Sequence, residues 1–345
     1  MDKVVRVGLI GAGGNMKSRH IPGFKTVSGL ELVAVANRSR ESGEKIAKEF
    51  GIPKVYDRWQ DLLASSEVDA VCIGTWPYMH CPITVAALES GKHVLCEARM
   101  AMNLAEARTM LEASKRHPHL VTQIVPGPPT LEVDSTISEL LSGGYFGKLQ
   151  ALELSVLTGF IHPETPLHWR QDKSLSGLNI LSMGIWYECL QRWLGQATSV
   201  VAMGSIAVPE RKDASGQMVP VTVADHIDLL ATFRGGVTAH LRFSSVAGLA
   251  PAPELWMFGT AGTVRFDPGT KKLFGGIRGD KSLHEIAISP EKRIGWRVEQ
   301  EFVSAIRGNE KVSRTNFEDG VLYMEFTEAV ARSLEQRRTI DLPLV

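Results

Sequence analysis

The sequence predicts an α/β protein with two domains: an N-terminal Rossmann domain built on a doubly wound parallel sheet, and a C-terminal α+β domain with a large, mostly antiparallel sheet. Three observations support this fold class. Short apolar runs alternate with helical patterns over residues 1–125, which is typical of parallel strands joined by crossover helices. A glycine-rich turn follows the first apolar run, and beyond residue 129 the pattern changes to strands with hairpin signals.

Apolar periodicity gives the elements expected in the first domain. The run at 4–10 is nearly continuous, as in a strand buried on both faces. Asn103 is followed by Glu106, an arrangement that caps the start of a helix. Strands are expected at residues 4–10, 31–36, 70–74, 93–96 and 120–125, and helices at 15–27, 42–50, 57–64, 82–90 and 103–116.

A proline cluster at 126–129 cannot continue a strand ladder, so we expect it to connect two domains that span residues 1–125 and 126–345. Further along, Gly235 and Gly236 separate two strand-like runs and predict a hairpin. The second domain is expected to hold strands at 149–157, 221–233 and 238–245, and helices at 131–141, 177–194, 296–307 and 318–336.

Composition and charge limit the classes of partner. Lys plus Arg and Asp plus Glu number 38 each, so no net field attracts nucleic acid or anionic lipid. The four cysteines form no CxxC pair, which is typical of reduced thiols. Residues 1–3 lead straight into an apolar run with no signal-peptide pattern, and no run reaches the length of a membrane span. We expect a cytoplasmic protein with a small-molecule substrate and no metal.

The glycine-rich turn predicts a dinucleotide site. Gly11, Gly13, Gly14, Asn15 and Met16 lie where the first strand passes into the first helix, which is the context that gives such a fingerprint weight. Gly11 permits the tight turn, and Gly13 lets the backbone approach a pyrophosphate at the helix N-terminus. Met16 replaces the usual third glycine and predicts a slightly displaced helix. The alternative is a glycine-rich turn without a ligand.

The end of the second strand indicates which dinucleotide is bound. An acidic residue there would hydrogen-bond the 2′-hydroxyl of NAD and repel a 2′-phosphate. This chain has Asn37, Arg38 and Ser39 instead. Arg38 could pair with the phosphate, and its two neighbours could donate hydrogen bonds. The sequence therefore favours NADP(H), with NAD as the alternative and a solvated Arg38 as the rival interpretation.

Several segments resemble the Gfo/Idh/MocA family of NAD(P)-dependent oxidoreductases. They are GLIGAGGNM at 8–16, TWPYMH at 75–80, GKHVLCEARMAMN at 91–103, HWRQDKSLSG at 168–177 and MGIWYECLQRWLG at 183–195. The resemblance implies oxidation or reduction of a sugar, cyclitol or related alcohol, an open-faced sheet in the second domain, and a homo-oligomer, either a dimer or a tetramer. It also implies that Thr75, Trp76, His80 and Glu97 lie beside the cofactor.

The catalytic positions of that family are not retained. The family usually has Glu-Lys-Pro where this chain reads Glu97-Ala98-Arg99, and alignment puts Ser182 and Trp186 at its second-domain Asp and His positions. Ala, Ser and Trp cannot act as general bases near neutral pH. Tyr187 is offset from Trp186 by about 100° of helix rotation. The side chains that could take the catalytic role are His80, Glu97, His168, Arg170, Lys173 and Tyr187, with Tyr78, Asp172 and Glu188 as further candidates.

The function expected from these residues is an NADP(H)-dependent oxidoreductase for a sugar-like or cyclic alcohol or carbonyl compound, with rearranged catalytic groups. Two alternatives stay open: a lyase or hydrolase that uses a tightly bound nicotinamide transiently or not at all, and a cofactor-binding protein without catalysis. Asp225, His226 and Asp228 suggest a metal site only weakly, because strand alternation points Asp225 away from the other two.

Overall fold

The computed structural model describes residues 4–159, 162 and 164–344, so the short segment at 1–3 that bears on a signal peptide lies outside it. The chain divides into two compact units. Unit 1 comprises Met1–Pro126 and Arg297–Met324, and unit 2 comprises Gly127–Trp296 and Glu325–Val345. We expected the domain boundary after residue 125, beside the end of the first segment of unit 1, and did not expect Arg297–Met324 to belong to unit 1.

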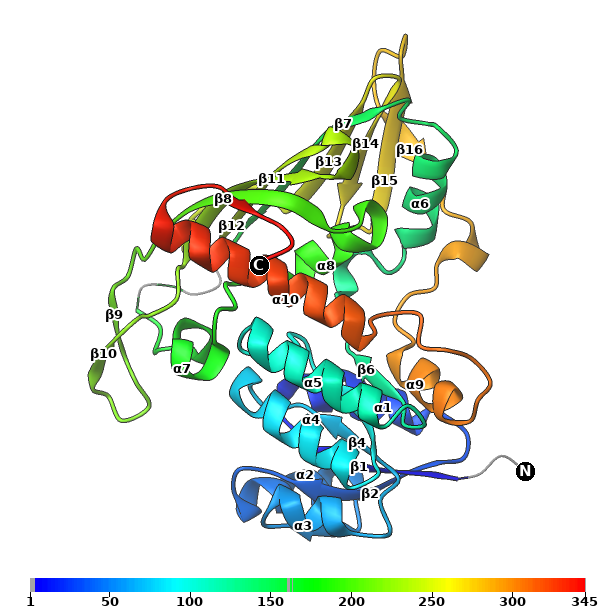
Figure 1. Ribbon diagram of the computed structural model, residues 1–345, viewed down its shortest axis with the longest axis vertical. Helices are drawn as coiled ribbons and strands as arrows, with labels where there is room; N and C mark the ends of the chain where they lie inside the picture. Colours follow the sequence, from blue (N-terminus) through cyan, green and yellow to red (C-terminus); the bar gives the residue numbers. More distant parts are fainter. Residues whose placement is uncertain (1–3, 160–161, 163, 345) are drawn as a thin grey trace. The chain divides into compact units, whose positions relative to one another are not determined.

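Unit 1 is built on a six-stranded parallel sheet with the order β3-β2-β1-β4-β5-β6 (Figure 1), which confirms the predicted Rossmann architecture. Strand order reverses between β1 and β4, and ligands of such sheets bind at this switch point, beyond the carboxyl ends of the strands. The strands are β1 (Val5–Ile10), β2 (Leu30–Ala36), β3 (Lys54–Tyr56), β4 (Ala70–Ile73), β5 (His93–Cys96) and β6 (Thr122–Ile124).

Helices join the strands of unit 1 as the crossover pattern requires. The capping predicted at Asn103 is present, because its side-chain oxygen accepts a hydrogen bond from the Glu106 N–H at 2.9 Å. The helical segments are η1 (Met16–His20, π-helical), α1 (Ile21–Lys25), α2 (Arg40–Phe50), α3 (Trp59–Ala64), η2 (Pro77–Met79), α4 (His80–Glu89), α5 (Leu104–Arg116) and α9 (Val298–Ile306).

The returning C-terminal segment completes unit 1. The N–H of Ile124, at the end of β6, donates to the carbonyl of Thr315 at 2.9 Å. The neighbouring Gln123 amide donates to the buried Glu301 carboxylate on α9 at 2.6 Å. Arg307 donates to the carbonyl oxygens of Ser28 and Gly29, in the turn before β2. Polar groups at two places in the N-terminal fold are therefore satisfied by residues about 180 to 280 positions away.

Unit 2 contains a nine-stranded sheet of order β16-β15-β14-β13-β7-β12-β11-β8-β17, in which only the β7–β12 pair is parallel among the described residues. The hairpin predicted around Gly235 and Gly236 joins β11 to β12. The strands of this sheet are β7 (Leu149–Leu157), β8 (Ala197–Ser205), β11 (His226–Phe233), β12 (Thr238–Ser244), β13 (Glu254–Gly259), β14 (Gly262–Asp267), β15 (Lys272–Ile277), β16 (His284–Ile286) and β17 (Ile340–Asp341). A separate two-stranded sheet consists of β9 (Glu210–Lys212) and β10 (Met218–Pro220).

One face of the nine-stranded sheet is covered by helices (Figure 1), and Ile227, Leu229 and Phe233 of β11 are buried beneath them. The helical segments assigned to unit 2 are η3 (Pro128–Thr130), α6 (Asp134–Ser142), η4 (Trp169–Gln171), α7 (Lys173–Ser176), α8 (Met183–Leu194), η5 (Arg234–Gly236) and η6 (Pro290–Lys292). Helix α10 (Phe317–Gln336) belongs to unit 1 up to Met324 and to unit 2 from Glu325.

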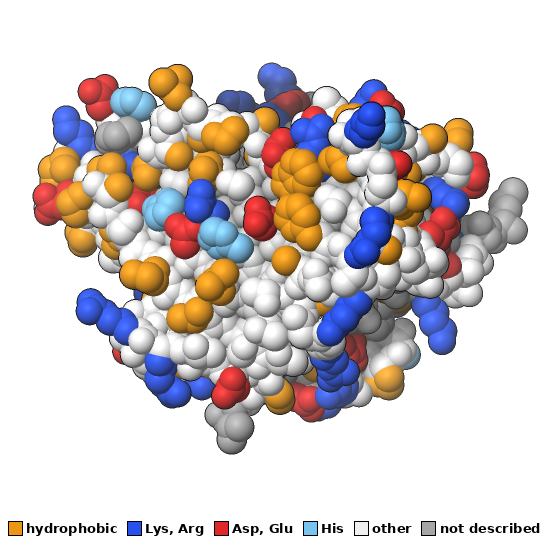
Figure 2. Space-filling view, turned by 90° about the horizontal axis from the view of Figure 1, so that it is seen from above, with side chains coloured by type: hydrophobic (Ala, Val, Ile, Leu, Met, Phe, Trp, Pro, Cys, Tyr) orange, Lys and Arg blue, Asp and Glu red, His pale blue; other side chains and the backbone are white. Residues whose placement is uncertain are grey.

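The opposite face of this sheet is partly exposed, as the alternation along β11 shows. His226 and Asp228 are half-buried and Leu230 is exposed, whereas the residues between them are buried. Figure 2 shows a face of the molecule on which histidine, acidic and basic side chains lie together among hydrophobic ones. Within the part of the chain that the structure describes, no helix combines the length and apolarity needed to cross a bilayer.

Candidate dinucleotide site

The turn after β1 is shaped by a glycine in a conformation that L side chains rarely adopt. Gly11 has φ = 78°, and a Cβ on it would lie 2.6 Å from the Thr75 Cγ2 and 2.7 Å from the Thr75 nitrogen. The next N–H, of Ala12, donates to the Asn37 side-chain oxygen at 2.7 Å. The carboxyl ends of β1, β2 and β4 are thereby held close together, and only glycine fits at position 11.

The helix after this turn presents its amino end to open space. Its first hydrogen bond runs from the Lys17 N–H to the Gly13 carbonyl at 3.0 Å, so the N–H groups of Gly14, Asn15 and Met16 point out of the N-terminus. A Cβ on Gly13 would meet only the Gly11 carbonyl, at 4.0 Å, and one on Gly14 would meet nothing within 4 Å. Such a cradle of N–H groups suits a pyrophosphate.

Met16 is accommodated by a helix that starts irregularly. Its side chain is buried, and residues 16–20 form a π-helical turn before the regular helix begins at Ile21. The π-helical turn is wider than an α-helical one and appears mostly as a local insertion. The helix therefore departs from regular geometry at the position where the sequence analysis expected it to be displaced.

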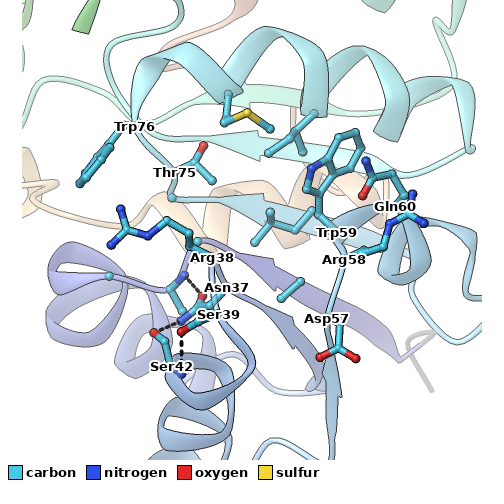
Figure 3. Close-up of a pocket in the computed structure, with 18 of the residues that line it drawn as sticks. Asn37, Arg38, Ser39, Ser42, Asp57, Arg58, Trp59, Gln60, Thr75 and Trp76 are labelled. Carbon is cyan, nitrogen blue, oxygen red and sulfur yellow. Dashed lines mark hydrogen bonds between the residues drawn. The ribbon is translucent and has the colours of Figure 1, made fainter. Parts of the chain in front are cut away.

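Beside the glycine turn lies a pocket of about 590 Å³ at the carboxyl ends of β1, β2 and β4 (Figure 3). Gly11, Gly13, Asn37, Arg38, Ser39, Thr75 and Trp76, all named from the sequence, line it. Arg58, Trp59 and Gln60 also line it but were not predicted. They follow the three-residue strand β3, which the sequence analysis missed. Recognising β3 would have placed them at this edge, where the carboxyl ends of parallel strands meet.

Of the three residues that follow β2, Asn37 and Ser39 hold the local structure together and Arg38 lines the pocket. The Asn37 amide donates to the Ser42 hydroxyl at 2.9 Å while its oxygen holds Ala12, so this side chain joins the turn to α2. The Ser39 oxygen caps α2 by accepting from the Ser42 N–H at 3.3 Å. The Arg38 guanidinium lies over the Trp76 ring, 5.4 Å from its centroid, and extends along the pocket wall (Figure 3). Arg38 therefore places a positive charge in the lining of the pocket on the β2 side.

Glu97, directly after β5, belongs to a buried chain of polar groups. One of its oxygens accepts from the Asn15 amide and faces the Nε2 of His20 at 2.9 Å. The Nδ1 of His20 faces the Glu299 carboxylate at 2.6 Å. His20 and Glu299 are fully buried, and 13% of the Glu97 side chain is exposed. Neither His20 nor Glu299 was predicted as a site residue, because 279 positions separate them in the chain.

The protonation of this chain follows from its geometry. A neutral imidazole has one N–H, so only the imidazolium donates to both carboxylates at once. Burial lowers the pKa of His20, but its hydrogen bonds to Glu299 and Glu97 outweigh burial and raise the pKa to about 9. Burial raises the pKa of Glu97, but hydrogen bonds from His20 and Asn15 dominate and lower it. Glu97 is therefore held as a carboxylate.

His80 does not have the environment expected of a catalytic or cofactor-contacting group. It is 1% exposed, and its ring nitrogens lie 2.9 Å from the Arg99 carbonyl and 3.0 Å from the Thr75 carbonyl. Burial lowers its pKa. Because its two ring nitrogens face backbone carbonyls on two different loops, His80 fixes the loops that follow β4 and β5, and its catalytic assignment is corrected to a structural one.

Three predicted residues lie together in unit 2, around η4. The His168 Nδ1 accepts from the Arg170 N–H at 3.3 Å, and the Arg170 guanidinium lies 4.2 Å from the centroid of the Trp169 ring. Lys173 begins α7, and its N–H donates to the Thr222 hydroxyl at 2.8 Å. Burial has the larger effect in lowering the pKa of His168, and the positive charge of Arg170 lowers this pKa further. His168 is therefore favoured in its neutral form.

Tyr187 is a second correction. Its ring stacks on Phe326 at a centroid distance of 3.6 Å, and its hydroxyl accepts from the Ala197 N–H at 2.9 Å in the core of unit 2. Burial raises its pKa. A fully buried hydroxyl already bonded to the backbone cannot reach a substrate, so Tyr187 is a core residue. Glu188 is likewise structural, because it pairs with Arg192 and accepts from the Gly127 N–H.

Asp228 joins His226, His240 and Arg242 on the partly exposed face of the nine-stranded sheet, at 2.9, 3.1 and 2.8 Å. Asp225 points elsewhere and accepts from the N–H groups of Ala207 and Val208. Strand alternation predicted this separation. Among residues 4–159, 162 and 164–344, no group of three or more His, Cys, Asp or Glu side chains is arranged to hold a metal ion.

The parallel sheet, the glycine turn at its switch point and the cradle of N–H groups define a nicotinamide-dinucleotide-binding oxidoreductase fold. Comparison with family models agrees. Residues 5–124 match an oxidoreductase family with an NAD-binding Rossmann fold, and residues 135–265 match the GFO/IDH/MocA C-terminal domain. The chain belongs to the Gfo/Idh/MocA family.

Named relatives are similar over about two thirds of the chain. Trans-1,2-dihydrobenzene-1,2-diol dehydrogenase of Mus musculus is 26% identical over 66% of this chain and 67% of its own length. Levoglucosan dehydrogenase of Pseudarthrobacter phenanthrenivorans is 27% identical over 67% of this chain and 60% of its own length. A solved levoglucosan dehydrogenase in complex with NADH superposes with a TM-score of 0.88 at 22% identity, covering 99% and 100% of the two chains.

Proposed function

We propose that this protein is an NADP(H)-dependent oxidoreductase for a sugar-like or cyclic alcohol or carbonyl compound. The observation that carries the cofactor proposal is the end of β2, where Arg38 lines the pocket and no acidic residue stands between Ala36 and Arg40. A guanidinium pairs well with a phosphate and stacks on an aromatic plane. A carboxylate at this position would instead favour the 2′-hydroxyl of NAD.

The site fits a dinucleotide by its shape and its donors. Gly11, Gly13, Gly14, Asn15 and Met16 would hold the pyrophosphate with their backbone, and Arg38 and Ser39 would hold the 2′-phosphate. Asn37 would act indirectly by fixing the turn. Trp76 and Thr75 would bound the cofactor after β4. The cofactor supplies hydride transfer when bound, and the protein supplies orientation and proton management.

The substrate class rests on the relatives, which are named as dehydrogenases of levoglucosan and of a dihydrobenzene diol. We propose that the catalytic groups are drawn from Glu97, His168, Arg170 and Lys173. Because Ala98 replaces the usual lysine, one of these side chains would receive the alcohol proton. His168 is favoured as a neutral imidazole, which is the form of histidine that can accept a proton.

The partly exposed face of the nine-stranded sheet is proposed as the surface of a homo-oligomer. Trp256 and Phe258 stack there at a centroid distance of 5.8 Å, and the Arg265 guanidinium lies over both Trp256 and Phe274. Leu230 and Met203 are 48% and 78% exposed on adjacent strands. Hydrophobic side chains in such numbers on one sheet face are typical of an interface.

The test of the cofactor proposal is a charge reversal at Arg38. Arg38→Asp should weaken NADPH binding by about 10- to 100-fold and leave NADH binding equal or tighter, because several charge-assisted hydrogen bonds are replaced by repulsion. Arg40→Asp is the matched control, since Arg40 is exposed and pairs with Glu44 on α2 and with Asp57, which follows β3. Equal loss of both dinucleotides in Arg38→Asp, or none, would contradict the NADP(H) assignment.

The reaction itself is tested by incubating the full chain with NADP⁺ and a panel of polyols, cyclitols and anhydrosugars. Reduction of NADP⁺ at 340 nm with at least one compound is expected. Elimination or hydrolysis of a substrate without net reduction would favour the lyase or hydrolase alternative. Tight binding of cofactor with neither reaction would favour a binding protein without catalysis.

A further inference from the structure

His20, Glu97 and Glu299 form a triad in which one imidazolium contacts two carboxylates, one more than a single ion pair contains. Two carboxylates and one imidazolium lie in a row, with the outer carboxylate and the imidazole fully buried. Counting these three side chains, the triad carries one net negative charge. Burying an extra carboxylate is costly, and Gly23 is needed to admit it, because a Cβ there would lie 2.5 Å from the Glu299 Oε2.

The triad lies on the side of the parallel sheet where the nicotinamide half of a dinucleotide would bind. In an open parallel sheet of this order a dinucleotide lies across the switch point between β1 and β4. The pocket around Arg38 is on the β1–β2–β3 side, so the other half belongs to the β4–β5 side. Glu97 is the first residue after β5, and it is tied to Asn15 of the glycine loop.

Charge is what distinguishes the two redox states of the nicotinamide. The oxidised ring is cationic and the reduced ring is neutral, whereas the phosphates, riboses and adenine are the same in both. A fixed negative charge in a poorly solvated place therefore acts on the ratio of the two affinities. A change confined to the contacts of the phosphates, riboses and adenine changes both affinities together.

We infer that the triad of His20, Glu97 and Glu299 raises the affinity of this protein for the oxidised dinucleotide relative to the reduced one. This inference rests on the proposed function, since it requires a nicotinamide dinucleotide at the site. Glu299 acts through His20 and Glu97 as a charge-setting residue and is not a catalytic residue. By stabilising the bound oxidised dinucleotide, it shifts the equilibrium on the enzyme towards NADP⁺ and alcohol, so carbonyl reduction is favoured over alcohol oxidation.

The charge that the test changes is that of Glu299. Cys72, Cys96 and His80 are further titratable side chains that interact electrostatically with the triad. Burial raises the pKa values of Cys72 and Cys96, so both thiols are neutral, and it lowers the pKa of His80. Removing the Glu299 charge while His20 stays protonated takes the triad from one net negative charge to zero.

The experiment measures dissociation constants of NADP⁺ and NADPH by calorimetry on the full chain at pH 6, where a histidine bonded to a carboxylate is protonated. Glu299→Gln should reduce the preference for the oxidised form by about 3- to 20-fold, the effect of one unit charge at roughly 10 Å and an effective permittivity of about 20 to 40. Glu299→Asp keeps the charge and should keep the ratio within about twofold.

Glu301→Gln is the matched control. Glu301 is a second buried carboxylate on α9, but it accepts from Gln123 and Ser313 instead of His20. It should lower stability and leave the ratio of affinities unchanged. A folded Glu299→Gln protein with the wild-type ratio would overturn the inference. Wild-type protein that binds neither nucleotide would instead overturn the proposed function.

A measurement on the wild-type protein keeps the test independent of whether Glu299→Gln folds. Between pH 7 and pH 10 the His20 imidazolium loses its proton near its pKa of about 9, and the triad gains a second negative charge. The preference for NADP⁺ over NADPH should therefore rise across this range. The 2′-phosphate is common to both nucleotides and cancels. A ratio independent of pH would contradict the inference.

Discussion

Met16 occupies the space in which a side chain on Gly74 would have to lie. A Cβ on Gly74 would be 2.6 Å from the Met16 Cε and 2.9 Å from the Gly11 carbonyl oxygen. In a glycine fingerprint the third glycine normally allows close packing between helix and strand. In this protein the small residue of the contact is Gly74, directly after Ile73 at the end of β4, and the large residue is Met16 on the helix.

Shortening Met16 should therefore damage unit 1. Met16→Ala is expected to lower the free energy of unfolding by about 2–5 kcal/mol, because it leaves a cavity beside Gly74. Urea denaturation followed by circular dichroism measures this loss. Met218→Ala, at a methionine that is 51% exposed on β10, should change stability by less than about 0.5 kcal/mol. Equal effects at the two sites would show that Met16 does not fill this space.

Trp76 is predicted to support NADPH through Arg38. Trp76→Leu keeps an apolar side chain but removes the aromatic face under the guanidinium. A contact of this kind at a partly exposed site contributes about 0.5–1 kcal/mol, so NADPH affinity should fall about two- to fivefold. Titration with NADH serves as the control because it lacks the 2′-phosphate. A proportional loss for NADH would mean that Trp76 contacts the cofactor without involving Arg38.

The stability of unit 1 should depend on pH through His20. Its pKa is raised from 6.5 to about 9 in the folded protein, so its stabilising contribution is present below pH 6.5 and is lost as pH rises through 9. The loss amounts to about 3 kcal/mol. The lowered pKa of Glu97 reflects the same ion pair with His20, so no separate contribution to stability is added for Glu97. Melting temperatures from pH 6 to pH 10 measure it.

The control for that pH dependence is a pair of variants. His20→Gln removes the titrating group and should flatten the profile between pH 6.5 and pH 9 while lowering stability throughout. His119→Gln, at an exposed histidine, should keep the wild-type profile. A steep profile that persists in His20→Gln would assign the pH dependence to another group.

Tyr187→Phe distinguishes a core role from a catalytic one. The substitution leaves the buried Ala197 N–H without its acceptor, so stability should fall by about 1–3 kcal/mol. The turnover number of the folded variant should stay within about twofold of the wild type, because the hydroxyl does not reach a substrate. A loss of about 100-fold in turnover without loss of stability would restore Tyr187 as a proton-transfer group.

Association through the nine-stranded sheet should be sensitive to charge at its aromatic pair. Phe258→Asp is expected to dissociate the proposed homo-oligomer, because a carboxylate would be buried against Trp256 and its surroundings. Light scattering after size exclusion measures the mass. Met218→Asp, on the separate β9–β10 ribbon, should leave the mass unchanged. An unchanged mass in Phe258→Asp would place the interface elsewhere.

Local chemistry made most of unit 1 predictable. The strand at 93–96 and the cap at Asn103 were recognised from apolar runs and side-chain types that act within a few residues. The three-residue β3 was missed because Lys54, Val55 and Tyr56 are too few to establish a period. Its absence from the prediction also hid Arg58, Trp59 and Gln60 at the pocket.

The site was predictable only where neighbours in sequence are neighbours in space. Gly11 and Arg38 follow strands directly, so their positions could be inferred. The link from Glu97 through His20 to Glu299 depends on α9, which folds back from the far end of the chain. Burial also decided the roles of His80 and Tyr187, and residue type alone cannot show that a polar group is already satisfied by backbone.

The return of Arg297–Met324 to the first unit imposes an order on biosynthesis. When the ribosome has released the six parallel strands, the segment that supplies partners for His20 and Gln123 has not yet been translated. The nucleotide-binding unit therefore lacks these hydrogen-bond partners until nearly the whole polypeptide has emerged. During that interval it is exposed to chaperones and proteases. A gene fragment that ends at Pro126 would encode a permanently unfinished fold, and any chimera that borrows this half must carry residues 297–324 with it.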